Sequence, residues 1–226
     1  MFRKYFMIIL IVFSAFLLTA CINNIPKVTE KTVLFDNSHN QTAGNADWTI
    51  RGGFSDYADD IKKMGYTVSE WGNDEYGKSQ IDDDAPITYE TLIKYGAYII
   101  PEPNKDFTLQ EQNDIIKYIN DGGNVFFISD HSGSDRNSNG VDSVKSFNKF
   151  VGKLGFTFVS KSYSQDPITD IRAHIITEGV HKTGMWAGTT ININNKTNVK
   201  GIIYLDDVSK GPYMAYGTYG KGKFVA

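Results

Sequence analysis

The stretch Asn124-Val-Phe-Phe-Ile-Ser-Asp-His-Ser-Gly133 decides the fold, because a short apolar run in it ends abruptly in polar residues. Apolar, β-branched and aromatic residues behind a Gly-Gly turn indicate a buried strand. In open α/β sheets, ligands bind just beyond the carboxyl ends of such strands. The sequence therefore predicts a site at Asp130, His131 and Ser132.

The same pattern of an apolar run with a polar ending recurs along the first two thirds of the chain. It predicts further strands at residues 32–36, 66–71, 97–100 and 156–160. Helices with three-and-four apolar spacing are expected to begin near Ser55, Thr88, Thr108 and Asp142. Thr108 and Glu111 have the spacing of a capping box. This alternation favours an α/β fold with a mostly parallel sheet and helices on both of its faces.

The last third of the chain changes to short alternating runs that are typical of antiparallel strands. They lie at residues 173–176, 189–193, 201–205, 214–219 and 223–226. We therefore expect a β-rich C-terminal part. Because the last run stops at Ala226, we also expect the domain to be truncated at its C-terminus.

Length and charge limit the class of protein. A chain of 226 residues suits one main domain, and a net charge of -3 with no long basic run outside the first residues makes nucleic acid an unexpected partner.

The first 21 residues are typical of a secretory signal. Arg3 and Lys4 precede an apolar run, and Leu18-Thr-Ala-Cys21 resembles the bacterial lipobox, whose cysteine is acylated. We expect residues 1–21 to be a lipoprotein signal peptide, residues 22–30 a tether and residues 31–226 the folded domain. The protein would then be anchored through Cys21 to the extracytoplasmic face of a bacterial cell membrane. An uncleaved anchor helix or a secreted protein are the alternatives.

One further segment carries a family resemblance. The run His174-Ile-Ile-Thr-Glu-Gly-Val180, followed by Gly188-Thr189, resembles the class I glutamine amidotransferase-like superfamily, in particular its trehalose-utilisation and intraflagellar or gliding-accessory branches. The resemblance implies a flavodoxin-like, doubly wound sheet. It also places His131 where amidotransferases carry a nucleophilic cysteine. The only cysteine is Cys21, so thiolate chemistry is excluded.

In a flavodoxin-like strand order the loops after the first, third and fourth strands converge. They carry the expected ligand-binding residues Asp36, Ser38, His39, Glu102, Asn104 and Ser132, with Trp48 as a stacking residue. Asp130 and His131 are the candidate catalytic pair. Asp36, His39, Asp130 and His131 are also candidate ligands of a divalent cation such as Ca, Mg or Zn. Alternatively, these polar residues end strands and cap helices.

The loop that follows could hold calcium. Asp135, Asn137 and Asn139 place oxygen atoms at alternate positions, as in the first part of an EF-hand. Ser146 stands where the closing glutamate would be, which argues against a true EF-hand. The alternative is a polar turn in which Asp142 caps the next helix.

These observations lead to one hypothesis and two alternatives. We expect an extracytoplasmic lipoprotein that binds a small polar ligand, with or without a divalent cation, and without amidotransferase activity. One alternative is a metal-dependent hydrolase of an ester, amide or sugar derivative, in which Asp36, Asp130 and His131 activate a metal-bound water. The other is an accessory domain of a membrane transport complex.

Overall fold

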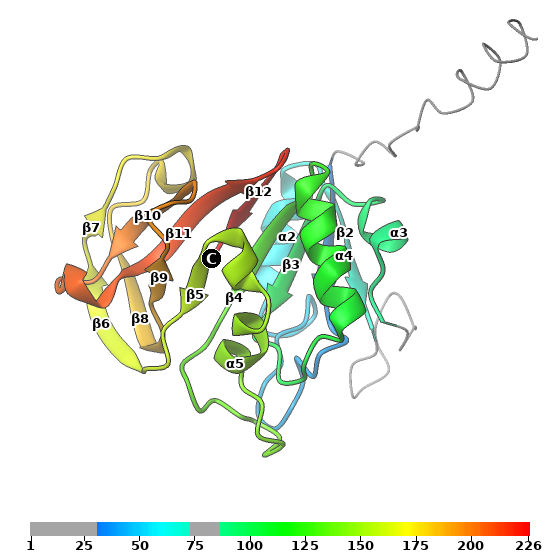
Figure 1. Cartoon of the computed structure of the whole chain (residues 1–226), viewed down its shortest axis with the longest axis horizontal. Helices are drawn as coiled ribbons and strands as arrows, with labels where there is room; N and C mark the ends of the chain where they lie inside the picture. Colours follow the sequence, from blue (N-terminus) through cyan, green and yellow to red (C-terminus); the bar gives the residue numbers. More distant parts are fainter. Residues whose placement is uncertain (1–30, 73–85) are drawn as a thin grey trace, which may run out of the picture.

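The fold is given by a computed structural model that describes residues 31–72 and 86–226 (Figure 1). The expected signal peptide with Cys21 and the expected tether at residues 22–30 lie outside the described residues. Among the helices that are described, none is long and apolar enough to cross a membrane.

A mixed sheet of eight strands forms the centre of the part of the chain that is described. Its strand order is β2-β1-β3-β4-β12-β11-β10-β7. The strands are β1 (Thr32–Asp36), β2 (Thr67–Trp71), β3 (Ala97–Pro101), β4 (Asn124–Ile128), β7 (Asp170–Ile171), β10 (Val199–Tyr204), β11 (Pro212–Tyr219) and β12 (Gly222–Val225). The pairs from β2 to β12 are parallel, and the pairs from β12 to β7 are antiparallel.

The parallel half has the strand neighbours that the sequence predicts, with β1 beside β3 and β3 beside β4. In the register of β3 with β4, Pro101 lies opposite Ile128. The loops that begin at Glu102 and Ser129 therefore leave the sheet side by side at its carboxyl edge.

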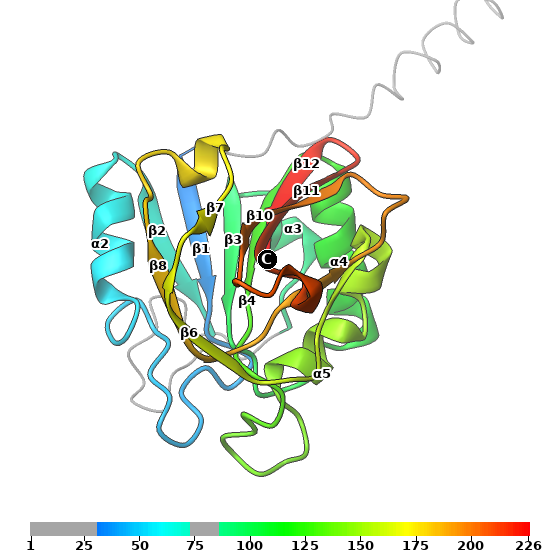
Figure 2. The same ribbon diagram turned by 90° about the vertical axis from the view of Figure 1, so that its left-hand side faces the viewer.

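Four helices of this part of the chain pack on the sheet. They are α2 (Ser55–Lys63), α3 (Tyr89–Leu92), α4 (Leu109–Asn120) and α5 (Ser143–Asn148). Ala58 and Ile61 of α2 cluster with Val33 and Phe35 of β1. The apolar residues of α4 cluster with the alternate side chains of the same strands, such as Leu34. Figure 2 shows α2 and α4 on opposite sides of the sheet.

The predicted cap of α4 is confirmed. The Thr108 side chain accepts a hydrogen bond from the Glu111 backbone N–H, and the Glu111 carboxylate accepts one from the Thr108 backbone N–H. Asp142 caps α5 as predicted, by accepting from the Lys145 N–H. Ser55 is instead the first helical residue of α2, because Phe54 occupies the N-cap position.

The strand predicted at residues 156–160 forms, but not in the main sheet. Strand β5 (Phe156–Phe158) pairs with β9 (Ile191–Ile193) in a separate two-stranded sheet. The place beside β4 is taken by β12, which runs parallel to it. A local apolar run predicts a strand but not its partner, and this partner comes from the far end of the chain.

The strand predicted at residues 173–176 is wrong. These residues lead into the short 3-10 helix η2 (Ile175–Thr177), where the His174 side chain accepts from the Ile176 N–H. The sequence pattern also missed a second two-stranded sheet of β6 (Tyr163–Ile168) and β8 (Thr183–Gly188), since its strands are largely polar or exposed.

Candidate functional site

A cleft of about 390 Å³ lies at the carboxyl ends of β3 and β4. Its polar wall consists of Glu102 after β3, Asp130 after β4 and Arg136 in the next loop. Its opposite wall comes from β8 and the start of β11. This is the edge of the sheet at which α/β folds place their ligands.

Arg136 is the centre of the polar wall. Its Nε donates to Glu102 Oε1 at 2.7 Å, and one terminal nitrogen donates to Asp130 Oδ2 at 2.8 Å. The other terminal nitrogen donates to Asn45 Oδ1 at 2.8 Å. The backbone N–H of Arg136 also donates to Asn104 Oδ1 at 3.0 Å. One guanidinium thus fixes carboxylates from two strands in a single orientation.

Glu102 is held in an unusual position. Its backbone φ is 28°, in the left-handed region that non-glycine residues seldom adopt, and its N–H donates to the Ile128 carbonyl at 2.8 Å. Burial raises the pKa of its carboxyl group; the Arg136 hydrogen bond opposes this rise, and the nearby charge of Asp130 adds to it. Strained backbone and shifted carboxyl groups gather at functional sites.

Aromatic side chains complete the cleft. Trp48, Phe54 and Tyr213 line it together with Trp186, whose surface is 72% exposed. The Arg136 guanidinium carbon lies 5.6 Å from the centre of the Trp48 ring, and Phe54 packs edge-on against the same indole. The cleft therefore combines a charged wall with flat apolar surfaces. Such a cleft can orient a ligand through its polar groups and exclude water from its apolar part.

Asp36 and His39, whose side chains are both buried, belong to a different network. The His39 Nδ1 lies 2.8 Å from Asp36 Oδ2, its Nε2 lies 3.4 Å from Glu111 Oε1, and its ring stacks on Phe107. The Ser38 hydroxyl donates to Asp36 Oδ1 at 2.8 Å. This network joins the loop after β1 to the first turn of α4.

The buried charges of this network determine one another's protonation. Burial alone would lower the pKa of His39, but the charge and hydrogen bond of Asp36, with those of Glu111, raise it to about 9. Burial would raise the pKa of Glu111, but the hydrogen bond and charge of His39 and the hydrogen bonds from Thr108 lower it to about 2. His39 is therefore a buried cation between two carboxylates at neutral pH.

His131 and Ser132 face elsewhere. The His131 Nδ1 lies 2.9 Å from the Ser132 carbonyl oxygen, and the Ser132 N–H donates to the Lys161 carbonyl. Neither residue lines the cleft, whereas their neighbour Asp130 does. The structure thus divides the predicted residues between the cleft (Asp130, Glu102, Trp48), its support (Asn104), the buried network (Asp36, Ser38, His39) and the loop after β4 (His131, Ser132).

The oxygen atoms of the expected calcium loop accept hydrogen bonds from the loop's own backbone. Asp135 accepts from the N–H groups of Asn139 and Gly140, and Asn139 accepts from the Val141 N–H. The side-chain amides of Asn137 and Asn139 donate to the Asn104 carbonyl. The loop is folded as a polar turn, which holds Arg136 against the cleft.

A metal site requires several ligand side chains to converge on one point. Within residues 31–72 and 86–226, no group of three or more His, Cys, Asp or Glu side chains is placed to hold a metal ion. Two carboxylates on one guanidinium can instead accept hydrogen bonds from hydroxyl or amino groups.

The sequence pattern missed the role of Arg136 and the contribution of Tyr213 to the cleft. Arg136 is one of four arginines in the chain and lies six residues beyond Asp130. A lone arginine in a loop between carboxylate-bearing strand ends is the signal that could have identified it.

Comparisons with known proteins identify the fold. No family model and no curated protein matches the chain. Among solved structures, it is similar to the mmIFT52 N-terminal domain, with a TM-score of 0.61 and 16% identity over 86% of this chain and 84% of that one. The cytoplasmic protein STM1381 from Salmonella typhimurium LT2 has a TM-score of 0.56 and 15% identity, with 86% of each chain covered.

A third similar structure is a ThuA-like protein from Bacteroides uniformis ATCC 8492, with a TM-score of 0.50 and 15% identity over 86% of this chain and 79% of that one. At these identities the likeness concerns the fold alone. The chain therefore shares the mixed α/β fold, with a largely parallel central sheet, of ThuA-like proteins.

Proposed function

We propose that this chain is an extracytoplasmic lipoprotein whose domain binds a small polar ligand in the cleft around Arg136. The observation that carries the proposal is the arrangement of Glu102 and Asp130 on one guanidinium at the carboxyl edge of the sheet. Their remaining lone pairs can accept hydrogen bonds from a ligand, while Trp48 and Trp186 contact its apolar parts.

The detailed topology of the fold also supports a ligand site around Arg136. We infer a flavodoxin-like member of the glutamine amidotransferase-like superfamily that lacks the nucleophilic cysteine. The strand order β2-β1-β3-β4-β12 supports this inference, because flavodoxin-like sheets have the order 2-1-3-4-5 and bind their ligand at the switch point between the first and third strands. The loop after β3 carries Glu102.

A thermal-shift screen tests the ligand site. The purified protein is heated with a panel of sugars, polyols, amino acids and carboxylic acids, and a compound that raises Tm is titrated into Asp130→Asn and Glu102→Gln. We expect both substitutions to weaken the affinity for the compound about tenfold or more, since each removes a charged hydrogen-bond acceptor. Glu178→Gln, in the exposed turn after η2, is the matched control and should respond like the parent. Equal responses in all variants would place binding outside the cleft.

The metal-dependent hydrolase is less well supported by the geometry. It requires Asp36, Asp130 and His131 around one metal-bound water, but Asp36 is buried in the His39 network and Asp130 lies in the cleft. Adding Ca, Mg or Zn in the same thermal-shift assay tests a divalent cation. A metal-specific rise in Tm that Asp130→Asn removes would favour the hydrolase over the metal-free binder.

The lipid anchor is tested through Cys21. In a bacterial host the full chain should incorporate labelled palmitate and fractionate with the membrane. Cys21→Ser should abolish labelling, because serine lacks the sulfur that is acylated. Unlabelled parent protein would contradict the anchor without affecting the ligand-site proposal.

A further inference from the structure

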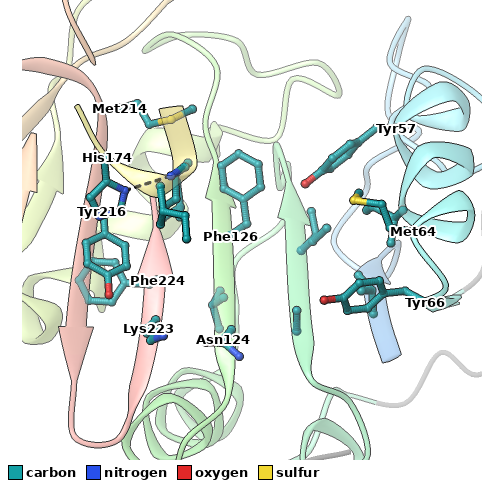
Figure 3. A pocket seen from close by; sticks show the side chains of 18 residues that line it. Tyr57, Met64, Tyr66, Asn124, Phe126, His174, Met214, Tyr216, Lys223 and Phe224 are labelled. Carbon is teal, nitrogen blue, oxygen red and sulfur yellow. Dashed lines mark hydrogen bonds between the residues drawn. The ribbon is translucent and has the colours of Figure 1, made fainter. Parts of the chain in front are cut away.

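A second cavity, unrelated to the cleft, opens on the face of the sheet beside α2. It has a volume of about 570 Å³. Its floor comes from β1, β3, β4 and β12, and its walls come from α2 with Tyr66 on one side and η2 on the other. Figure 3 shows Tyr57, Met64 and Tyr66 across from His174 and Tyr216, with Phe126 between them. We call this cavity the α2 groove.

The α2 groove gathers the exposed apolar surface of the described residues. Nine large apolar side chains are exposed among them, and five line this groove: Tyr57, Met64, Tyr66, Ile175 and Ile176. Ile175 is 81% exposed and Met64 is 64% exposed. A contiguous apolar patch of this kind marks an interaction surface, whereas scattered apolar residues do not.

The position of the groove determines what can fill it. Each floor strand already has a neighbour on both sides, so the groove offers no free sheet edge to an added strand. Parallel strands are normally covered by helices on both faces. On this face α2 covers the β2 and β1 side, and no described helix longer than η2 covers β4 and β12.

Charge indicates the orientation of such a helix. The helix α2 runs antiparallel to the strands, and its last turn, with Lys62 and Lys63, lies near the start of β2. Lys223 at the start of β12 is the charged residue among those that line the groove. A helix parallel to α2 would direct the negative end of its dipole, and any acidic residue of its last turn, toward Lys223.

We propose that the α2 groove is the docking site for an amphipathic α-helix of a partner protein, seated parallel to α2 with an acidic last turn against Lys223. Its apolar stripe would pack on Phe126 and between Tyr66 and Ile176. This partner site does not depend on the ligand site at Arg136.

A charge-swap experiment tests the proposal. The probe is a fluorescein-labelled helical peptide of about 14 residues, some 21 Å long, with apolar residues on one stripe and two Glu in its last turn. A second peptide carries Lys at those two positions. Fluorescence anisotropy measures the binding of each to the full chain and to Lys223→Glu.

We expect the parent protein to bind the Glu peptide more tightly than the Lys peptide. The Lys223→Glu variant should bind the Glu peptide about tenfold more weakly than the parent does, and should prefer the Lys peptide. Ile175→Asp should also weaken binding about tenfold, whereas Val208→Asp, at another exposed apolar residue, should not. Circular dichroism verifies that the variants fold, and Asp130→Asn should bind the peptide normally.

Three results would overturn the proposal. The first is equal binding of both peptides to both proteins, or no binding. The second is a dimer in sedimentation that Ile175→Asp dissociates, since the occupant would then be a second copy of this chain. The third is displacement of the peptide by a long-chain fatty acid at stoichiometric concentration, which would identify the groove as a lipid site.

Discussion

Arg136 compensates the two carboxylates of the cleft, so its removal has a predictable electrostatic effect. In Arg136→Met, Glu102 and Asp130 lose their shared cation and repel each other. We expect a loss of about 2 kcal/mol in the free energy of unfolding at pH 7, less than for a fully buried pair because Arg136 is partly exposed. The loss should shrink at pH 4, because the raised pKa of Glu102 favours its protonation there, which relieves the repulsion. Urea denaturation at the two pH values measures it.

The control for Arg136 is Arg172→Met. Arg172 pairs with Asp170 on the surface, where solvent screens the charges, so this pair contributes little to the free energy of unfolding. Equal losses at both arginines, or a loss at Arg136 that is the same at pH 4 and pH 7, would show that the guanidinium does not hold the carboxylates together.

His39 gives the protein a defined pH dependence. Its pKa is raised to about 9 from the ordinary histidine value of 6.5, so the charged form stabilises the fold fully below pH 6.5 and less as the pH rises to 9. Up to about 3 kcal/mol would be lost over this interval. Glu111, with a pKa lowered to about 2 from 4.5, contributes above pH 4.5, and its contribution is lost as the pH falls. Stability should therefore be highest between pH 4.5 and 6.5.

His39→Asn should flatten the alkaline limb of this profile. The variant lacks the group that deprotonates, although it is less stable overall because Asp36 and Glu111 lose their cation. His181→Gln, at an exposed histidine, should keep the parent profile. Denaturation at several pH values would contradict the assignment if His39→Asn still lost stability between pH 6.5 and 9 as the parent does.

At the scale of elements, β12 depends on a close backbone approach. A Cβ added to Gly222 would lie 2.2 Å from the carbonyl oxygens of both Gly123 and Ile119, which are backbone atoms at the turn between α4 and β4. Gly222→Ala must therefore shift β12 away from β4, at a cost of about 1–3 kcal/mol. Gly152→Ala, where the added Cβ meets nothing within 4 Å, is the control. Similar unfolding midpoints for both variants would argue against the observed β4 and β12 pairing.

Sequence patterns predicted local elements better than their partners. The strands β1 to β4 and the cap of α4 were predictable because apolar runs, glycine stops and Thr108 encode them within a few residues. The insertion of β12 beside β4 was not predictable, since it pairs residues such as Asn124 and Lys223 that lie 99 positions apart in the chain. At residues 173–176 a short apolar run predicted a strand, yet Ile175 and Ile176 are exposed and the His174 side chain favours a 3-10 turn.

In the candidate site, too, local features were predictable from the sequence and long-range contacts were not. Asp130, Glu102 and Trp48 were predictable because they follow strands or lie in a glycine-rich loop at the edge where ligands bind. The separation of Asp36 and His39 from the cleft residues was not predictable, because it depends on the contact that Glu111 of α4 makes with His39. Likewise, only the folded turn at residues 135–142 directs Arg136 toward two strand ends.

For the molecule as a whole, the cleft and the α2 groove are formed by different parts of one sheet. The cleft lies beyond the carboxyl ends of β3 and β4, whereas the groove lies over the face of β3, β4 and β12 and reaches their amino ends at Asn124 and Lys223. A ligand and a partner helix could therefore bind at the same time.

The indole N–H signals of the three tryptophans test the ligand site most directly. Trp48 and Trp186 line the cleft, whereas Trp71 is buried in the main apolar cluster. Protein labelled with ¹⁵N is titrated with a compound from the thermal-shift screen, and Trp→Phe variants assign the three signals. We predict that the Trp48 and Trp186 signals shift saturably while the Trp71 signal stays unchanged. In Asp130→Asn the same titration should leave all three signals unshifted. Binding that leaves the Trp48 and Trp186 signals in place would contradict a ligand site at Arg136.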